Sequence, residues 1–205
     1  ARLDQARQLN VLGRPAEAIH ILERIEHPLA TISILDRTRW LRARAIAAIY
    51  HSDFRPALRW LEESIGLAKR HGYSIDAANA QVVRAWCMLL QERFDDALAL
   101  YRDAEEVYRR HDLPLRLAYS ARNIGVVSMY QGRYDQALAA YLNAQRYFAT
   151  LQRRGNLGGI HLNLGNLHYF TARWDAALAH YLRAETLFLE RGMVNDALVA
   201  QRNRA

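Results

Sequence analysis

The sequence repeats itself with a period of 40 residues. The heptapeptide Arg-Phe-Asp-Asp-Ala-Leu-Ala that starts at Arg93 returns as Arg-Tyr-Asp-Gln-Ala-Leu-Ala from Arg133 and as Arg-Trp-Asp-Ala-Ala-Leu-Ala from Arg173. The alanine at the fifth position of this motif has earlier counterparts at Ala57 and Ala18. A fixed period of this length is typical of repeat proteins, in which each repeat is one small structural unit that packs on its neighbours.

Two more series of residues follow the same period. Glycine inside a helix costs about 1 kcal/mol relative to alanine, so Gly125 and Gly165 need a compensating contact. We expect that contact to be the close approach of Tyr141 and Tyr181, whose rings bury a large apolar area. The series of small residues is Ala6, Ala45, Ala85, Gly125, Gly165 and Ala205, and the series of large residues is Leu22, Leu61, Tyr101, Tyr141 and Tyr181.

Each repeat contains two stretches with the apolar spacing of a helix, and none alternates like a strand. The sequence therefore predicts an all-α fold, a right-handed superhelical solenoid of about five helix-turn-helix repeats plus a partial sixth, forming a single domain over residues 1–205. The predicted repeats are 1–31, 32–73, 74–113, 114–155, 156–193 and 194–205. The predicted helices are 1–12, 15–26, 32–50, 54–70, 75–91, 94–110, 115–131, 134–152, 157–171, 174–189 and 194–205.

Glycine and proline mark the expected turns. Gly72, Gly155 and Gly192 are expected to follow second helices, and Pro114 is expected just ahead of a first helix. The glycine-rich stretch 155–159 lacks the lysine and the serine or threonine of a phosphate-binding loop, and no strand precedes it. We interpret it as a turn between repeats.

The repeat resembles the tetratricopeptide repeat (TPR) family. Asn123-Ile124-Gly125, followed by Gln-Gly-Arg-Tyr-Asp-Gln-Ala over 131–137, is similar to that family's Asn-Leu-Gly and Gln-Gly-x-Tyr-Asp-x-Ala motifs, and 163–165 repeats the first of them. Arg44 and Arg84 replace an expected core leucine, so the first helices of the early repeats are expected to pack irregularly. Long repeats of this kind resemble arrays of bacterial signalling proteins, including those with CHAT proteases and MalT-like activators. The resemblance implies a scaffold for protein–protein interactions.

No enzyme site is expected. Cys87 lies in an apolar helix without a nearby histidine in sequence, which favours a small buried thiol. The eight histidines form no His-Glu-x-x-His motif and no pair four residues apart, so neither a metal site nor a cofactor is predicted. His161 and His168 occupy positions that face the partner helix and are interpreted as core histidines.

The chain carries a net charge of +7, and Lys69 is its only lysine. Arg93, Arg133 and Arg173 are expected in turns, whereas Arg109, Arg110, Arg153, Arg154 and Arg191 are expected in the last turns of helices, where the helix dipole favours them. Nucleic acid is therefore disfavoured as a partner in this interpretation, although RNA binding stays open on charge alone. A lone cysteine and the absence of a long apolar run or visible signal peptide predict a cytoplasmic protein without a membrane span.

The first helices are expected to line a concave groove that binds a peptide or helix of a partner, or another domain of the same polypeptide. Asn123, Asn163 and Asn203 recur every 40 residues, and their amides can bond a peptide backbone. Arg122 and Arg202 lie beside this series, with Arg42 at the equivalent position two repeats earlier, and arginine there would select carboxylates. Two other interpretations stay open: a domain that senses a small effector for a signalling or activator protein, and asparagines that have no binding role. The predicted peptide-binding residues are Arg42, Trp86, Tyr119, Arg122, Asn123, Asn163, Asn166, Tyr169 and Asn203.

Overall fold

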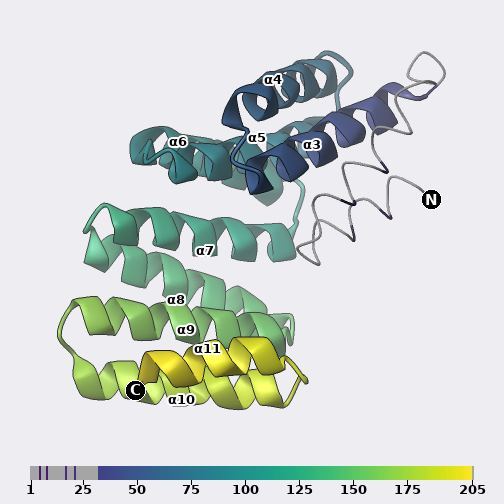
Figure 1. Ribbon diagram of the computed structural model, residues 1–205. Coiled ribbons are helices and arrows are strands. Elements are labelled where there is room, and N and C mark those ends of the chain that lie inside the picture. The colour runs from purple at the N-terminus through teal and green to yellow at the C-terminus, as the bar shows by residue number, and fades with distance from the viewer. Residues whose placement is uncertain (1–4, 6–7, 9–16, 18–20, 22–31, 205) are drawn as a thin grey trace. The chain divides into compact units, whose positions relative to one another are not determined.

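The computed structural model describes residues 32–204 and the single positions 5, 8, 17 and 21. Within 32–204 every regular element is an α-helix (Figure 1), which confirms the all-α class. Apart from these four positions, the predicted helices 1–12 and 15–26, with Ala6, Ala18 and Leu22 of the repeat series, lie outside the described residues, as does Ala205. The helices are α3 (Ile34–Tyr50), α4 (Phe54–Arg70), α5 (Ser74–Leu90), α6 (Phe94–Arg110), α7 (Pro114–Tyr130), α8 (Tyr134–Thr150), α9 (Arg154–Phe170), α10 (Trp174–Leu189) and α11 (Val194–Arg204).

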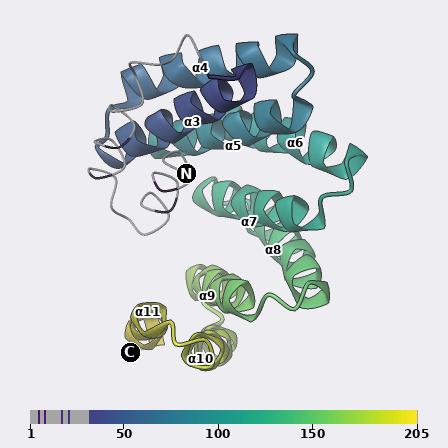
Figure 2. The same ribbon diagram turned by 90° about the vertical axis from the view of Figure 1, so that its right-hand side faces the viewer.

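The chain divides into two compact units, Ala1–Val107 and Tyr108–Ala205, here called unit 1 and unit 2. In unit 1, α4 packs against both α3 and α5. In unit 2, α8 packs against α7 and α9, and α10 packs against α9 and α11 (Figure 2). Each unit is therefore a stack of helical hairpins. Their union into a single domain, and the hand of the superhelix, stay predictions of the repeat pattern.

Three-residue loops separate the helices from α3 to α10, and a four-residue loop precedes α11. The second-last residue of each loop has a left-handed backbone, which is glycine at Gly72, Gly132 and Gly192 and a side-chain-bearing residue such as Ala172 elsewhere. The N–H of the last loop residue donates to the carbonyl five residues earlier, as from Arg133 to Ser128 at 2.9 Å. Because this closure recurs, α7, α8 and α9 each have 17 residues.

The interpretation of residues 155–159 as a turn is wrong, because α9 begins at Arg154. The left-handed residue of the preceding loop is Gln152, so the chain has already turned before these glycines. Gly155 and Gly158 allow close packing instead. A β-carbon on Gly158 would lie 2.8 Å from the ring of Phe188, and one on Gly155 would lie 2.9 Å from Met193 Sδ.

Three further predictions about helix ends need correction. Arg153 and Arg154 lie at the start of α9 and not at the end of a helix, and Arg154 pairs there with Glu190 at 2.8 Å. Pro114 is the first residue of α7, a position where its missing N–H leaves no helical bond unmade. Arg191 lies in the loop after α10, which ends at Leu189. Arg109 and Arg110 do lie in the last turn of α6, as predicted.

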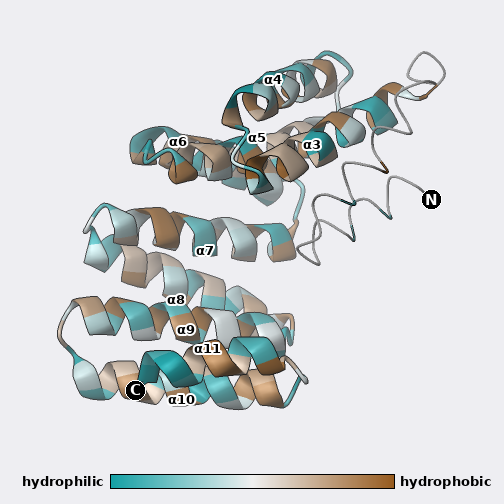
Figure 3. Ribbon diagram, viewed as in Figure 1, coloured by the Kyte–Doolittle hydropathy of each residue, from teal (hydrophilic) through white to brown (hydrophobic). Residues whose placement is uncertain are grey.

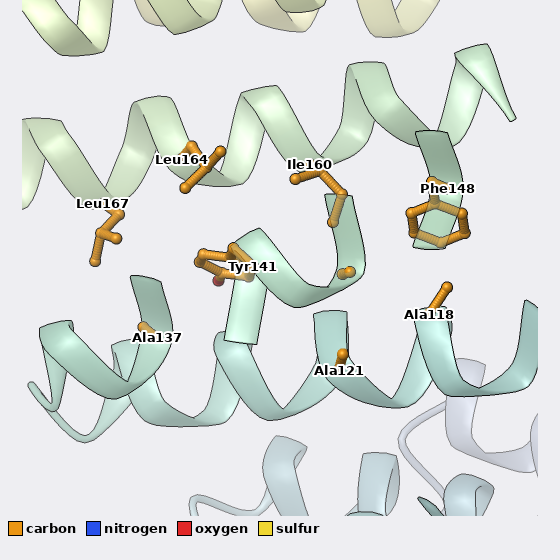
Figure 4. Close-up of a cluster of buried hydrophobic side chains, with 9 residues drawn as sticks. Ala118, Ala121, Ala137, Tyr141, Phe148, Ile160, Leu164 and Leu167 are labelled. Atoms are coloured by element: carbon orange, nitrogen blue, oxygen red, sulfur yellow. The ribbon is translucent and has the colours of Figure 1, made fainter. Parts of the chain in front are cut away.

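The predicted contact between glycine and tyrosine is confirmed in both hairpins of unit 2. A β-carbon on Gly125 would lie 2.5 Å from the ring of Tyr141, and one on Gly165 would lie 2.5 Å from the ring of Tyr181. Tyr141 is fully buried. Its ring belongs to a cluster between α7, α8 and α9 (Figure 4), whose buried members are Ala118, Ala121, Ala137, Tyr141, Ala144, Phe148, Ile160, Leu164 and Leu167.

Unit 1 has alanine in place of glycine and leucine in place of tyrosine at the equivalent positions, and Ala45 and Leu61 are both fully buried in one cluster. Around Arg44, α3 is a regular helix of 17 residues, and the irregular packing expected of the first helices of the early repeats stays a prediction. The guanidinium carbon of Arg44 lies 5.1 Å from the ring centroid of Trp40 and 4.3 Å from that of Trp60. Two indoles therefore supply the apolar and electrostatic surroundings that let a cation replace the leucine.

Candidate functional site

The predicted residues of α7 form one group of contacts. Tyr119, Arg122 and Asn123 are three and four residues apart and so lie on one side of the helix. The guanidinium of Arg122 lies 5.3 Å from the ring centroid of Tyr119. Its Nη2 donates to Asn123 Oδ1 at 3.2 Å. The carbonyl of Asn123 is thus engaged, and its amide nitrogen has no hydrogen bond within residues 32–204.

Side chains of α9 continue this surface in both directions. Asn156 Nδ2 donates to the Tyr119 hydroxyl at 3.0 Å, which joins α9 to α7. Asn203 Nδ2 of α11 donates to Asn166 Oδ1 at 3.1 Å, which joins α9 to α11. These bonds make one polar surface over α7, α9 and α11, hereafter the first-helix face of unit 2. Figure 3 shows that α11 is hydrophilic toward its C-terminal end.

A buried tyrosine orients the amide of Asn166. Tyr181, which packs on Gly165, donates its hydroxyl hydrogen to Asn166 Oδ1 at 2.9 Å. Burial raises the pKa of Tyr181, so the phenol is protonated and acts as the donor at neutral pH. Since Oδ1 of Asn166 then accepts two hydrogen bonds, its NH₂ group is left to donate to a ligand.

The unused hydrogen-bonding groups on this face are mainly donors. Within the described chain, the NH₂ groups of Asn123, Asn163 and Asn166 have no partner. Asn163 forms no side-chain hydrogen bond there, so its carbonyl is also unused, as is that of Asn203. Arg122 adds a positive charge. A face of this kind suits a ligand that presents acceptors, such as peptide carbonyls or carboxylates.

The aromatic residue predicted beyond Asn166 is exposed. Tyr169 has 52% of its surface accessible, and its ring packs edge-to-face against Phe170 and Trp174 at centroid distances of 6.0 and 5.2 Å. Tyr169 lies one turn beyond Asn166 on α9. It therefore extends the first-helix face of unit 2 toward an exposed aromatic group.

The two predicted residues of unit 1 have local partners. Arg42 Nη1 lies 3.5 Å from Asp76 Oδ1, and Arg39 Nε lies 3.1 Å from the same oxygen. Trp86 is half-buried and packs edge-to-face on Tyr50 at 5.3 Å. Internal contacts thus engage Arg42 and Trp86, and the structure groups neither with the residues of unit 2.

The polar bridges between repeats were missed in the sequence. Asp76, Asn156 and Tyr181 were not among the predicted site residues, although each holds a predicted residue or its equivalent. A usable signal exists, because Arg39–Asp76, Tyr119–Asn156 and Asn166–Asn203 are each polar pairs 37 residues apart. A search of the sequence for two polar residues separated by 37 positions, three fewer than the period of 40, would have found all three pairs.

Other kinds of site find little support in the described chain. Cys87 is buried, as predicted, and burial raises the pKa of its thiol, which disfavours the reactive thiolate. Among residues 32–204 and the four single positions, no three histidine, cysteine or acidic side chains are placed to hold a metal ion. No helix in that same part of the chain is both long and apolar enough to cross a bilayer.

Comparisons with known proteins identify the fold. No model of a protein family matches this chain, and no curated protein sequence matches it. Among solved structures, the chain is similar to aspartyl phosphate phosphatase F from Bacillus subtilis, with a TM-score of 0.86 and 15% identity over 99% of this chain and 54% of that one. It thus spans about half the length of that protein.

Two further solved structures extend the comparison. A signal transduction ATPase of the STAND class with a tetratricopeptide repeat sensor, from Pyrococcus horikoshii, has a TM-score of 0.84 and 15% identity over 99% of this chain and 31% of its own. NprR in complex with its cognate peptide NprX has a TM-score of 0.70 and 15% identity over 98% of this chain and 65% of its own. The fold is therefore that of tetratricopeptide-type helical repeat proteins, as the sequence motifs predicted.

Proposed function

We propose that this chain is a non-catalytic interaction domain that binds a peptide or helix of a protein partner on the first-helix face of unit 2. The observation that carries this proposal is the set of unused amide groups on Asn123, Asn163 and Asn166. They belong to consecutive first helices that are joined by side-chain hydrogen bonds. Buried polar groups are normally paired within a protein, so half-buried amides left unpaired in register are suited to an external partner.

The chemistry of the face favours an extended segment with exposed carbonyls. Asn163 can both donate and accept, so it can pair with a peptide group through both of its functions. Arg122 next to Asn123 favours a carboxylate close to that segment. Tyr169 offers an exposed aromatic surface for an apolar side chain of the ligand, and Tyr, Trp and Arg are common among residues that dominate binding energy.

The similarity to NprR supports this assignment, since that protein is described in complex with a peptide. A second candidate is a sensor domain within a signalling protein, because the similar ATPase is described as carrying a tetratricopeptide repeat sensor. The two candidates share the binding face and differ in what the bound ligand controls. Another domain of the same polypeptide is a partner that suits either of them.

A peptide selection tests the proposal without requiring that the natural partner be identified first. A random peptide library displayed on phage is selected against the immobilised chain, and the enriched peptide is mapped on the protein by NMR chemical-shift changes. We expect the side-chain amide signals of Asn123, Asn163 and Asn166 to shift. Shifts confined to the second helices α8 and α10 would contradict the proposal. In a separate binding assay with RNA, an affinity that exceeds that of every selected peptide and falls steeply with salt concentration would also contradict it.

A further inference from the structure

Three histidines of unit 2 meet on the side of α9 opposite to its asparagines. His161 and His168 are seven residues apart and share one side of the helix, whereas Asn163 and Asn166 face away from it at 3.6 residues per turn. The Nδ1 atoms of His161 and His180 are 2.9 Å apart. The ring of His168 stacks on that of His180, with centroids 5.2 Å apart and planes 15° apart. The three imidazoles therefore form one cluster inside the α9–α10 hairpin.

The hydrogen bonds of this cluster require uncharged rings. Gln145 of α8 lies with its Nε2 3.4 Å from His161 Nε2, so the amide donates to an unprotonated ring nitrogen. The single proton of a neutral His161 is then on Nδ1 and is donated to His180 Nδ1. His168 Nδ1 is buried without a hydrogen-bond partner in the described chain. Within the described chain, neither Nε2 of His161 nor Nδ1 of His180 therefore faces an acceptor for an additional proton.

The charged groups around the cluster are cations. Burial is the main cause that lowers the pKa of His161 and of His168. His180 and Arg183 of α10 add to the effect on His161, whose pKa is lowered to about 4 in total, and Arg173 adds to the effect on His168. No carboxylate is among the causes that shift the pKa of these three histidines, and Glu185 of α10 accepts from Gln201 and Arg204 of α11. The α8 side supplies the neutral Gln145.

We propose that His161, His168 and His180 form an acid-sensitive lock, which holds α9 against α10 while the rings are neutral and releases the hairpin when they are protonated. A proton on His180 Nδ1 would oppose two N–H groups across 2.9 Å. A proton on His161 Nε2 would face the Gln145 amide hydrogen. Because α9 carries Asn163 and Asn166, release also weakens the ligand face, and this second consequence rests on the proposed function.

The direction of the pH effect follows from the lowered pKa values. Unfolded histidine titrates near 6.5, so between about pH 4 and 6.5 the unfolded chain binds more protons than the folded chain. The free energy of unfolding therefore falls as the pH drops through this window. It is independent of these histidines above about pH 7, where they are neutral in both states.

The repeat itself supplies non-titrating replacements for the test. The residues 80 positions earlier are Gln81, Met88 and Leu100, which suggests the triple variant His161→Gln, His168→Met and His180→Leu. Thermal unfolding is followed at pH 7 and pH 4.5. We expect the wild-type Tm to fall by at least about 3 °C more than that of the triple variant. His51→Gln, at an exposed position after α3, is the control and should keep the wild-type pH dependence.

Two readouts separate the lock from the proposed function. Equal losses of Tm in wild type and triple variant would overturn the lock, and so would an NMR titration of His161 in the wild type with a midpoint near 6.5. The NMR readout needs no variant to fold. Affinity for a peptide from the phage selection, compared at pH 7 and pH 5, tests the ligand face separately. If the wild type loses affinity between pH 7 and pH 5 and the triple variant does not, the histidine cluster is coupled to the ligand face. If the wild-type affinity is the same at both pH values, that coupling is overturned, while the lock and the proposed function are not.

Discussion

The same pair of repeat positions joins first helices in both units, but with different chemistry. In unit 1 the pair is Arg39 and Asp76, an ion pair of 3.1 Å in which Arg42 also takes part. In unit 2, 80 residues later, it is Tyr119 and Asn156, a neutral hydrogen bond of 3.0 Å. The repeat geometry thus determines which positions are in contact, and the residues at those positions determine whether the contact is an ion pair or a neutral hydrogen bond.

This difference explains why the candidate face lies in unit 2. In unit 1 the carboxylate of Asp76 already engages the predicted binding residue Arg42. In unit 2 the neutral bridges leave Asn163 without a side-chain partner among residues 32–204 and direct the NH₂ group of Asn166 outward. An internal ion pair and a ligand cannot both use the full charge of Arg42, so the first helices of unit 1 are the weaker candidate.

The core contacts offer the largest test of this comparison. Gly125→Ala should destabilise unit 2 by about 1–3 kcal/mol, because the added carbon would overlap the Tyr141 ring. Tyr141→Leu should cost ~2 kcal/mol through lost contacts and a residual cavity. The double variant reproduces the Ala45–Leu61 pair of unit 1 and should recover about 1–3 kcal/mol of the summed cost. Urea unfolding of the four proteins measures this coupling.

A matched control for that cycle lies at Gly159 on α9, where an added β-carbon would meet nothing within 4 Å. Gly159→Ala should stabilise the protein by up to about 1 kcal/mol, since only helix propensity changes there. Strictly additive costs in the double variant would show that the two units do not use interchangeable core pairs.

The polar bridges should differ in strength. Asp76→Asn leaves Arg39 and Arg42 without their carboxylate at a largely buried position and should cost about 1.5–3 kcal/mol. Asn156→Ala removes one neutral hydrogen bond and should cost about 0.5–1.5 kcal/mol. Denaturant unfolding at low and high salt distinguishes them, since only the first cost should shrink in salt. An equal cost for both variants would remove the proposed contrast between the units.

The loops give the smallest expected effect. Ala172 adopts a left-handed backbone with φ of 55°, whereas the equivalent Gly132 has φ of 70°. Ala172→Gly should therefore stabilise the protein by up to about 1 kcal/mol, and Gly132→Ala should destabilise it by a similar amount. Thermal unfolding monitored by circular dichroism is sufficient. Destabilisation by both variants would mean that helix ends, and not the left-handed residue, control loop stability.

The sequence predicts the fold of the described residues well because the period is visible in several series at once. The contact of Gly125 with Tyr141 could be predicted because a glycine inside a helix is costly and the series of large residues places Tyr141 at the matching position of the second helix. The start of α9 could not be found in this way, since glycine favours turns in general and only the packed Phe188 explains Gly158 inside a helix. The role of Tyr181 was also hidden, because a core position gives no sign that its hydroxyl reaches Asn166.

The histidine cluster shows a similar limit. His161 and His168 were interpreted as core residues, and both are indeed partly buried on α9. His180 lies on the next helix, and sequence spacing alone does not show that its Nδ1 comes within 2.9 Å of His161. Contacts within one helix follow from periodicity, whereas contacts between helices also depend on how the two helices pack.

Calorimetric titration of a phage-selected peptide into Asn163→Ala and Arg183→Ala tests the central claim most directly. Asn163 lies on the first-helix face of unit 2, and Arg183 is an exposed residue of the second helix α10. The account predicts that Asn163→Ala weakens binding by about 1–3 kcal/mol, the cost of leaving a partner group unpaired, while Arg183→Ala leaves affinity unchanged. Equal losses in the two variants, or no loss in Asn163→Ala, would contradict it.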